Sequence, residues 1–250
     1  MKLAIISGVS GKLGRTYAER LMRDKQTRVI GIARHEDSES CIETLIVDLT
    51  DQGRTESALG TIDLKGIDEI IYIHAVGGFK FEEKIEDCGP EVDTNDDGID
   101  DEVYSSNVET CRNVVSILYK KAHDQGIPLC IGAFGSVSDR YHVPFWHSYS
   151  ASKDILRKEL RALSAKDDAV GVTFIDVNTV CTGNEERLRP NGKKQYWLSV
   201  EEVVDRSLTH ITEARGYTEI TIFKNDVPVD PAWYQRDRVL ARWKSQMPTS

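Results

Sequence analysis

The sequence predicts an α/β fold in which a doubly wound parallel sheet carries helices on both faces. Two observations predict it: short apolar runs alternate with amphipathic stretches along most of the chain, and a glycine-rich turn follows the first run. Apolar strands that alternate with helices favour parallel pairing, because right-handed crossovers place helices over both faces of the sheet. A length of 250 residues fits one large domain better than two small ones, so we expect a single domain over residues 1–250.

The expected strands are short apolar runs at residues 3–6, 29–33, 44–47, 69–74, 128–134, 172–177 and 219–223. The expected helices cover residues 13–23, 55–59, 103–121, 149–164 and 200–209. Two segments depart from this alternation. Residues 81–102 are acidic, and the tail after Phe223 carries Trp233, Tyr234 and Trp243. We expect this tail to wrap over the body of the domain or to form a subunit contact.

Composition excludes several classes of partner. The formal net charge is −9, which argues against nucleic acid or an anionic membrane, since both require a basic surface. A small basic pocket for an anionic ligand is still compatible with that charge. The five cysteines are scattered and include no C-x-x-C pair, which is typical of reduced thiols in a cytoplasmic protein. No run approaches the roughly 20 apolar residues of a membrane span, so we expect a cytoplasmic location.

A glycine-rich turn connects the first strand to the first helix. The segment reads Ser7-Gly8-Val9-Ser10-Gly11-Lys12-Leu13-Gly14. Glycine permits a tight turn and lets the backbone approach a pyrophosphate, and the helix N-terminus supplies free N–H groups and partial positive charge. The position after a strand and before a helix therefore predicts a Rossmann-type dinucleotide site. A glycine-rich loop without a ligand is the simpler alternative.

The residue after the second strand indicates the choice of cofactor. NAD-binding proteins of this class place a carboxylate about 20 positions after the glycines, where it binds the ribose hydroxyls. Here that place reads Ala33-Arg34-His35. Ala33 has no carboxylate, and Arg34 suits a 2′-phosphate. The sequence thus favours NADP(H) over NAD(H), unless Arg34 is an ordinary surface arginine.

A tyrosine and a lysine stand four residues apart at the start of the helix expected at 149–164. On a helix, this spacing places Tyr149 and Lys153 on one face, one turn apart. A nearby ammonium favours phenolate, so we expect Lys153 to lower the pKa of Tyr149 and allow it to donate and accept a proton. An exposed helix pair is the alternative.

Over nearly its whole length the chain resembles the short-chain dehydrogenase/reductase family. The resemblance rests on the Gly8/Gly11/Gly14 loop, Asp48, Asn107, Ser136, and Tyr149 with Lys153, in that order. It implies that Tyr149 is the general acid/base and that Lys153 tunes it while binding the nicotinamide ribose. It further implies that Ser136 hydrogen-bonds the substrate carbonyl, that Asn107 holds a water in a proton relay, and that Asp48 lies beside the adenine. Ser138 is the alternative catalytic serine.

The resemblance also places the residues that follow other strands beside the cofactor: Leu49, His74, Ala75, Val76, Val180 and Thr182. His74 has an alternative interpretation as a packed structural histidine. The chain departs from the usual family pattern in three places. The glycine loop matches the G-x-x-G-x-x-G form of extended and atypical members. His74-Ala75-Val76-Gly77 replaces the usual Asn-Asn-Ala-Gly, and 178–182 lacks the usual Pro-Gly.

The substrate is not readable from the sequence. We expect the pocket to be built from residues 77–104, 137–147 and 182–198. Pro144-Phe145-Trp146, beside His142 and His147, fits either an aromatic wall of this pocket or a purely structural role. The acidic segment 93–101 resembles a calcium loop, because it carries oxygen ligands at alternate positions. It lacks the bidentate glutamate of an EF-hand, and a solvated acidic loop is favoured, so no metal site is predicted.

Three functions fit these motifs. The first is an NADP(H)-dependent carbonyl reductase or alcohol dehydrogenase that acts on a small or medium organic substrate. The second is a nucleotide-sugar epimerase or dehydratase, suggested by the glycine loop, although such relatives usually carry a longer C-terminal substrate domain. The third is an NADP-binding regulatory protein without turnover, although such members typically lose the tyrosine or lysine. The resemblance further implies a homodimer or homotetramer.

Overall fold

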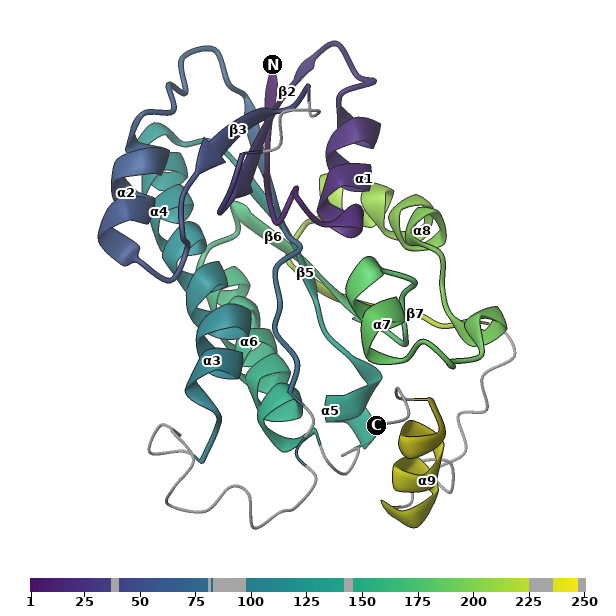
Figure 1. Ribbon diagram of the computed structural model, residues 1–250. Coiled ribbons are helices and arrows are strands. Elements are labelled where there is room, and N and C mark those ends of the chain that lie inside the picture. Colours follow the sequence, from purple (N-terminus) through teal and green to yellow (C-terminus); the bar gives the residue numbers. More distant parts are fainter. Residues whose placement is uncertain (37–40, 81, 83–97, 142–145, 225–235, 247–250) are drawn as a thin grey trace.

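Seven parallel strands form one sheet at the centre of the described chain (Figure 1). The computed structural model describes residues 1–36, 41–80, 82, 98–141, 146–224 and 236–246. The strand order is β3-β2-β1-β4-β5-β6-β7, and every neighbouring pair is parallel. The strands are β1 (Lys2–Ser7), β2 (Thr27–Ala33), β3 (Glu43–Ile46), β4 (Glu69–His74), β5 (Leu129–Phe134), β6 (Val170–Val177) and β7 (Tyr217–Ile222). The doubly wound α/β prediction is confirmed.

The long helices cover the two faces of the sheet, as the alternating pattern predicts (Figure 1). On one face, α2 (Gln52–Gly60), α4 (Thr110–Gln125) and α6 (His147–Lys166) bury residues such as Leu59, Leu118 and Leu160 against the strands. On the other face, α1 (Lys12–Leu21) and α8 (Val200–Thr212) do so with Tyr17 and Val203. Burial of both faces explains why the central strands are apolar throughout rather than alternating.

The helix expected at 103–121 is interrupted. It consists of α3 (Asp101–Tyr104), the π-helical turn η2 (Ser105–Glu109) and α4. Such a π-helical turn often marks a functional site, because it shifts side chains away from the regular helical positions. Here it contains the predicted site residue Asn107.

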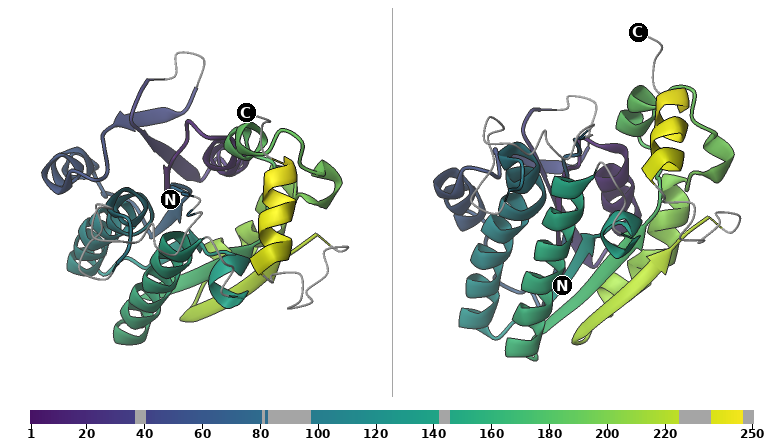
Figure 2. Two further views of the ribbon diagram at one scale, coloured as in Figure 1. Left: turned by 60° about the horizontal axis from the view of Figure 1, so that its bottom comes forward. Right: turned by 90° about the horizontal axis from the view of Figure 1, so that it is seen from below.

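Four further short elements have no counterpart in the sequence prediction: α5 (Val137–Tyr141), α7 (Gly183–Leu188), the 3₁₀ turn η3 (Lys194–Tyr196) and α9 (Arg236–Gln246). Helix α9 packs beside the segment that contains α7 in both views of Figure 2. There the amide N–H of Asn191 donates to the carbonyl of Gln246 at 3.2 Å. The end of the chain therefore does wrap over the domain, although Trp233 and Tyr234 lie outside the described residues.

The strand order changes direction between β1 and β4. The chain winds outward from β1 through β2 to β3, and then crosses to β4 and continues toward β7. Ser7 and His74 are register partners at the carboxyl ends of these two strands, and the amide N–H of Ala75 donates to the carbonyl of Ser7 at 3.2 Å. In open α/β sheets, ligands bind outside the carboxyl ends of strands at such a switch point.

Among the described helices, none is long and apolar enough to cross a membrane.

Candidate active site

The predicted site residues lie along the carboxyl edge of the sheet. The turn after β1 and the first turn of α1 carry Gly8, Ser10, Gly11, Lys12, Leu13 and Gly14, and further candidates follow the other strands: Arg34 after β2, Asp48 and Leu49 after β3, Ala75 and Val76 after β4, Ser136 after β5, and Val180 and Thr182 after β6. Tyr149 and Lys153 lie in the first turns of α6. Residues from across the chain thus meet at one edge because every strand is parallel.

Two of the three loop glycines are required by packing, and the third faces open space. Gly8 has a φ of +78°, and a Cβ there would lie 2.6 Å from the carbonyl oxygen of Ala75. A Cβ on Gly14 would lie 2.4 Å from the carbonyl oxygen of Gly8. A Cβ on Gly11 would meet only that same oxygen, at 3.3 Å. The fold therefore explains Gly8 and Gly14, whereas Gly11 keeps the outer side of the turn open.

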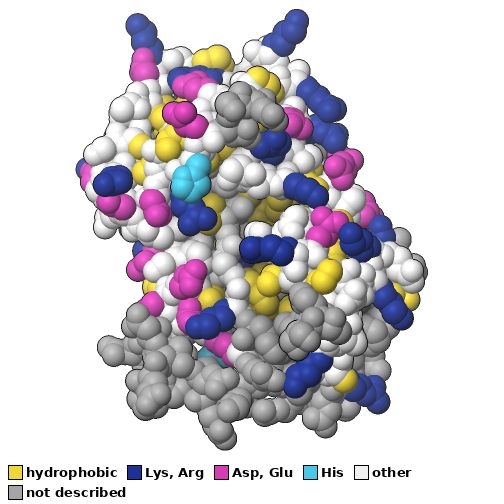
Figure 3. Space-filling view, in the orientation of Figure 1, with side chains coloured by type: hydrophobic (Ala, Val, Ile, Leu, Met, Phe, Trp, Pro, Cys, Tyr) yellow, Lys and Arg dark blue, Asp and Glu magenta, His cyan; other side chains and the backbone are white. Residues whose placement is uncertain are grey.

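The N-terminus of α1 is suited to an anion. Its first turn contains no acidic residue, and the cap residue Gly11 supplies no side-chain hydrogen bond to the N–H groups. Unpaired N–H groups and the helix dipole favour a phosphate at such an end. The face of the molecule in Figure 3 is hollowed near its middle, and Lys and Arg side chains surround this hollow although the protein as a whole is acidic.

Helix α7 contacts the N-terminus of α1. Glu186 pairs with Lys12, the first residue of α1, at 3.3 Å and with Lys194 at 2.8 Å. Thr182 serves as the N-cap of α7, with its hydroxyl accepting from the amide of Glu185, and Val180 forms an isolated parallel bridge with Leu198. The two predicted cofactor contacts after β6 therefore lie where α7 begins, facing the loop after β1.

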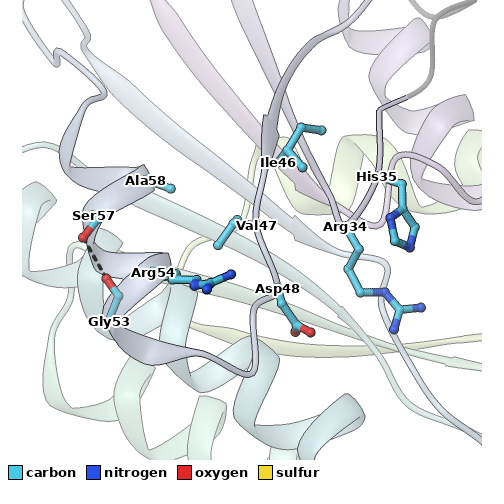
Figure 4. Close-up of a pocket in the computed structure, with 9 residues that line it drawn as sticks. All are labelled: Arg34, His35, Ile46, Val47, Asp48, Gly53, Arg54, Ser57 and Ala58. Atoms are coloured by element: carbon cyan, nitrogen blue, oxygen red, sulfur yellow. Dashed lines mark hydrogen bonds between the residues drawn. The ribbon is translucent and has the colours of Figure 1, made fainter.

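A pocket of about 760 Å³ lies between the end of β2 and α2. In Figure 4, Asp48 lies between Arg34, at the end of β2, and Arg54, from α2. Hydrogen bonds from the amide and hydroxyl of Thr50 lower the pKa of Asp48, and the charges of Arg34 and Arg54 lower it further. Arg54 was not predicted from the sequence. The feature that could have indicated it is its positive charge near the start of the helix after β3. The pocket thus combines a carboxylate with two guanidinium groups.

Leu49 lies beneath this pocket. Its side chain is buried in the core between the sheet and α2, and its carbonyl accepts from the side-chain amide of Asn113 at 2.8 Å. Because the side chain of Leu49 is packed in the core, it has little surface left to contact a ligand.

Tyr149, Ser136 and Lys153 are brought together. The Ser136 side chain lies close enough to the Tyr149 hydroxyl to lower its pKa, and the Lys153 ammonium lies 5.4 Å from the centre of the Tyr149 ring. The amide of Ser138 donates to the Ser136 hydroxyl at 3.2 Å, while the Ser138 hydroxyl is buried without a hydrogen-bond partner among the described residues. The geometry therefore pairs Tyr149 with Ser136 rather than with Ser138.

The pKa of Tyr149 differs from the value expected from the sequence, which was a lowered one. Burial raises the pKa of Tyr149 well above its ordinary value, and only the Ser136 hydrogen bond opposes it, while Glu185 and Asp139 raise the pKa further. Lys153 faces the ring rather than the hydroxyl, so the expected lowering by its ammonium is not found. Burial lowers the pKa of Lys153 itself to about 8.

Asn107 lies beside Lys153. Its side-chain amide donates to the carbonyls of Gly78 and Val103 at 2.8 and 2.9 Å, which orients its oxygen the other way. That Oδ1 atom is buried and has no hydrogen-bond partner among the described residues. A Cβ on Gly77 would lie 2.9 Å from Asn107 Oδ1 and 3.4 Å from Lys153 Nζ. The Asn107 oxygen lies next to the Lys153 ammonium and beneath the exposed Gly77, so it is suited to accept a hydrogen bond from a hydroxyl or a water.

His74 belongs to a buried polar network behind the site. Its Nδ1 lies 3.1 Å from the Ser7 hydroxyl and 3.0 Å from the Tyr72 hydroxyl. Burial lowers the pKa of His74 to about 3, the nearby Lys153 ammonium lowers it further, and a hydrogen bond to the Asn107 backbone opposes both. His74 is fully buried, which favours the structural interpretation of this residue over direct contact with a cofactor.

His74→Gln is expected to flatten the pH dependence of stability. The unfolded histidine binds a proton near pH 6.5, whereas the folded one does so only near pH 3. The unfolded state therefore holds the extra proton in this window, and the free energy of unfolding falls as the pH drops from 6.5 toward 3. Denaturant unfolding at intervals from pH 7 to 4 should show a slope smaller by about 1.4 kcal/mol per pH unit in the variant. The exposed His210→Gln is the control; an equal slope in wild type and His74→Gln would contradict the prediction.

Phe79 contacts Tyr149 and belongs to a cluster with two tryptophan side chains. Phe79 packs edge-on against the Tyr149 ring with centroids 5.4 Å apart, and it stacks on Trp243 of α9 at 5.5 Å. Trp146 contacts both Phe79 and Trp243, at 5.5 and 5.2 Å. Trp146, from the predicted aromatic wall, is part of this cluster, while His142, Pro144 and Phe145 lie outside the described residues and His147 is exposed. Phe79 and Trp243 were not predicted at this place.

The acidic segment 93–101 is only partly described, because 93–97 lie outside the described residues. Asp100 has a structural role: it accepts from the amide of Val103 as the N-cap of α3 and pairs with Lys80. Among the described residues, no group of three or more histidine, cysteine, aspartate or glutamate side chains could hold a metal ion. The solvated acidic loop expected at 93–101 therefore stays a prediction.

Comparison with known proteins identifies the fold. No protein-family model matches the sequence, and no curated protein matches it. Among solved structures, 4-hydroxyisoleucine dehydrogenase with NADH is 18% identical, with 89% of this chain and 96% of that chain covered and a TM-score of 0.71. ElxO with NADP bound is 13% identical, with 88% and 96% covered and a TM-score of 0.72.

A short-chain type dehydrogenase/reductase from Mycobacterium ulcerans is 13% identical, with 88% of each chain covered and a TM-score of 0.71. These identities are too low to transfer substrates or residue roles, but the structures agree along most of the chain. The chain therefore has the fold of the short-chain type dehydrogenases and reductases.

Proposed function

We propose that this protein is an NADP(H)-dependent oxidoreductase of the short-chain dehydrogenase/reductase family, interconverting a carbonyl and an alcohol on a small or medium organic substrate. The observation that carries the proposal is the proximity of the Tyr149 and Ser136 side chains, with Lys153 on the same helix face as Tyr149, at the carboxyl edge of the sheet. Solved structures that share the fold were obtained with NADH or NADP, which supports a nicotinamide cofactor.

The residues present fit such a cofactor. The pyrophosphate would bind at the open turn around Gly11 and at the N-terminus of α1. The adenosine end would lie near Asp48 and Arg34, in the pocket beside α2. Lys153 and the unpaired oxygen of Asn107 would receive the nicotinamide ribose or a bound water. When bound, the cofactor supplies or accepts the hydride; all proton transfer is left to the protein.

Tyr149 supplies the proton in this proposal. A carbonyl oxygen that receives hydride on its carbon becomes an alkoxide unless a proton reaches it, and the Tyr149 hydroxyl is the donor. The high pKa of Tyr149 keeps it protonated at neutral pH, which suits carbonyl reduction. Ser136 hydrogen-bonds the same oxygen and stabilises its developing charge. In alcohol oxidation, the positive charge of an oxidised nicotinamide would favour phenolate.

NADPH oxidation against a panel of ketones, aldehydes and nucleotide sugars tests the function. Turnover of ketones or aldehydes is expected. Turnover of nucleotide sugars alone would favour an epimerase or dehydratase, and NADPH binding without any turnover would favour a regulatory protein. Both of those outcomes overturn the proposal. A homodimer or homotetramer and a cytoplasmic location also stay predictions.

Arg34→Ala is expected to reduce the preference for NADPH over NADH by about 10- to 100-fold, because a guanidinium that pairs with the 2′-phosphate has no counterpart to bind in NADH. Arg34 is exposed, so its removal should change stability little. Michaelis constants for both cofactors check this. Arg23→Ala, an exposed arginine after α1, is the matched control. An unchanged preference in Arg34→Ala would remove this arginine from the site.

A further inference from the structure

Behind Tyr149 and Lys153, the same face of α6 carries an arginine surrounded by carboxylates. Arg157 follows Lys153 by one helical turn, and its side chain is only 13% exposed. Its guanidinium pairs with Asp139 of α5, with Asp176 of β6 at 3.0 Å and with Glu219 of β7 at 3.5 Å. It also lies over the ring of Phe174, 4.8 Å from the centre. One side chain thus connects four elements.

Two of these carboxylates belong to the surroundings of Ser136. Asp139 lies on α5, the short helix that begins directly after Ser136, and its side chain is only 1% exposed. On the other side of the serine, a Cβ on Gly135 would lie 2.2 Å from Asp176 Oδ1 and 2.4 Å from Phe174 Cε1. Gly135 therefore rests directly on groups that contact Arg157. The turn that carries Ser136 is held against α6 from both ends by this arginine.

The charges in this cluster act on the proposed proton donor and its lysine. The carboxylate of Asp139 raises the pKa of both Lys153 and Tyr149. Arg157 faces that carboxylate and offsets part of its charge. Four other groups act on the pKa of Lys153 or Tyr149 or lie against them: Cys111 of α4, His74 of β4, Glu185 of α7, and Ser136. The surroundings of Arg157 further include Asp154, Arg161 and Tyr217.

We propose that Arg157 is a positioning residue for the reaction: it fixes the turn of Ser136 against α6 and neutralises Asp139 beside Tyr149 and Lys153. The catalytic part of this assignment rests on the proposed function, whereas the electrostatic part concerns the folded protein alone. A guanidinium suits this task because its planar fork serves several carboxylates at once and stays charged when buried.

The pKa of Lys153 depends on the charges of Arg157 and Asp139, and it can be measured without any turnover. Lys153 titrates near pH 8, so ¹³C NMR of protein labelled at the lysine ε-carbon can follow it in the folded state, with Lys153→Met used to assign the signal. Arg157→Met removes a positive charge, favours the ammonium, and should raise the pKa of Lys153 by about one pH unit. Asp139→Asn should lower this pKa by a similar amount. In the double variant no net charge is lost, and the pKa should return close to the wild-type value.

Two controls separate this role from a purely structural one. Arg161→Met removes the next arginine on α6, which pairs with Glu219 at 2.6 Å, and should leave the pKa of Lys153 unchanged. Arg157→Lys keeps the charge but loses the planar fork, so it should leave that pKa nearly unchanged and lower kcat for carbonyl reduction about tenfold. If Arg157→Met does not fold, Asp139→Asn and Arg157→Lys still test the assignment.

An unchanged pKa of Lys153 in Asp139→Asn would overturn the electrostatic role. A wild-type kcat in Arg157→Lys or in the charge-balanced double variant would overturn the positioning of Ser136. Absence of turnover in the wild-type protein with every substrate would refute the proposed function instead, and the NMR titrations would still decide whether Arg157 controls the charge at Lys153.

Discussion

Tyr149→Phe is expected to lower NADPH-dependent carbonyl reduction by about 10³-fold or more, while NADPH binding stays nearly unchanged. General acid catalysis typically contributes about 10²- to 10⁴-fold, and the hydroxyl of Tyr149 is the acidic group paired with Ser136. The phenylalanine ring keeps the edge-on packing against Phe79, so the fold should tolerate the change. Steady-state kinetics with the best ketone of the panel, together with NADPH binding by fluorescence, measure the two effects separately.

Tyr119→Phe is the matched control for this experiment, because Tyr119 lies on α4 and packs against His123 rather than against a predicted site residue. It should keep wild-type kinetics. Substantial residual activity in Tyr149→Phe would exclude Tyr149 as the proton donor. Loss of NADPH binding in the same variant would show that the ring or hydroxyl supports the cofactor, and would leave the source of the proton open.

Gly14→Ala is expected to destabilise the protein by about 3 kcal/mol, at the upper end of the usual cost of overpacking. The new methyl group would lie 2.4 Å from the carbonyl oxygen of Gly8 and 2.7 Å from its carbonyl carbon, and neither backbone atom is free to move. The phosphate loop must therefore shift, and NADPH affinity should fall together with stability. Urea unfolding without cofactor measures the first effect, and NADPH titration measures the second.

Gly11→Ala separates the two effects. Gly11 has a φ of −87°, which alanine adopts readily, and its Cβ would meet only the Gly8 oxygen at 3.3 Å. Stability should change by less than about 1 kcal/mol. The methyl group would nevertheless project into the open side of the turn, where the pyrophosphate is proposed to approach, so NADPH should bind more weakly. Equal stability losses in the two variants would contradict the packing argument. Unchanged NADPH affinity in Gly11→Ala would place the pyrophosphate elsewhere.

Much of the fold follows from local patterns that a single sequence displays. The strand expected at 69–74 has the same bounds as β4, and the other six expected strands and the five expected helices have counterparts in the structure. Periodicity suffices for this because an element in a layered fold must bury a continuous apolar face. The candidate active site was predictable through the resemblance to a known family, and the parallel sheet brings its residues together because residues that follow successive strands share one edge.

The sequence by itself determined the elements, their parallel arrangement, and the grouping of the glycine loop with Ser136, Tyr149 and Lys153. Only the tertiary structure decided the charge state of Tyr149, because burial depends on side chains such as Phe79 and Trp243 that are distant in sequence. It likewise decided the environment of Arg157, whose carboxylates come from three other elements. Spacing along one helix reveals which side chains share a face, whereas the surroundings of that face depend on which elements pack against it.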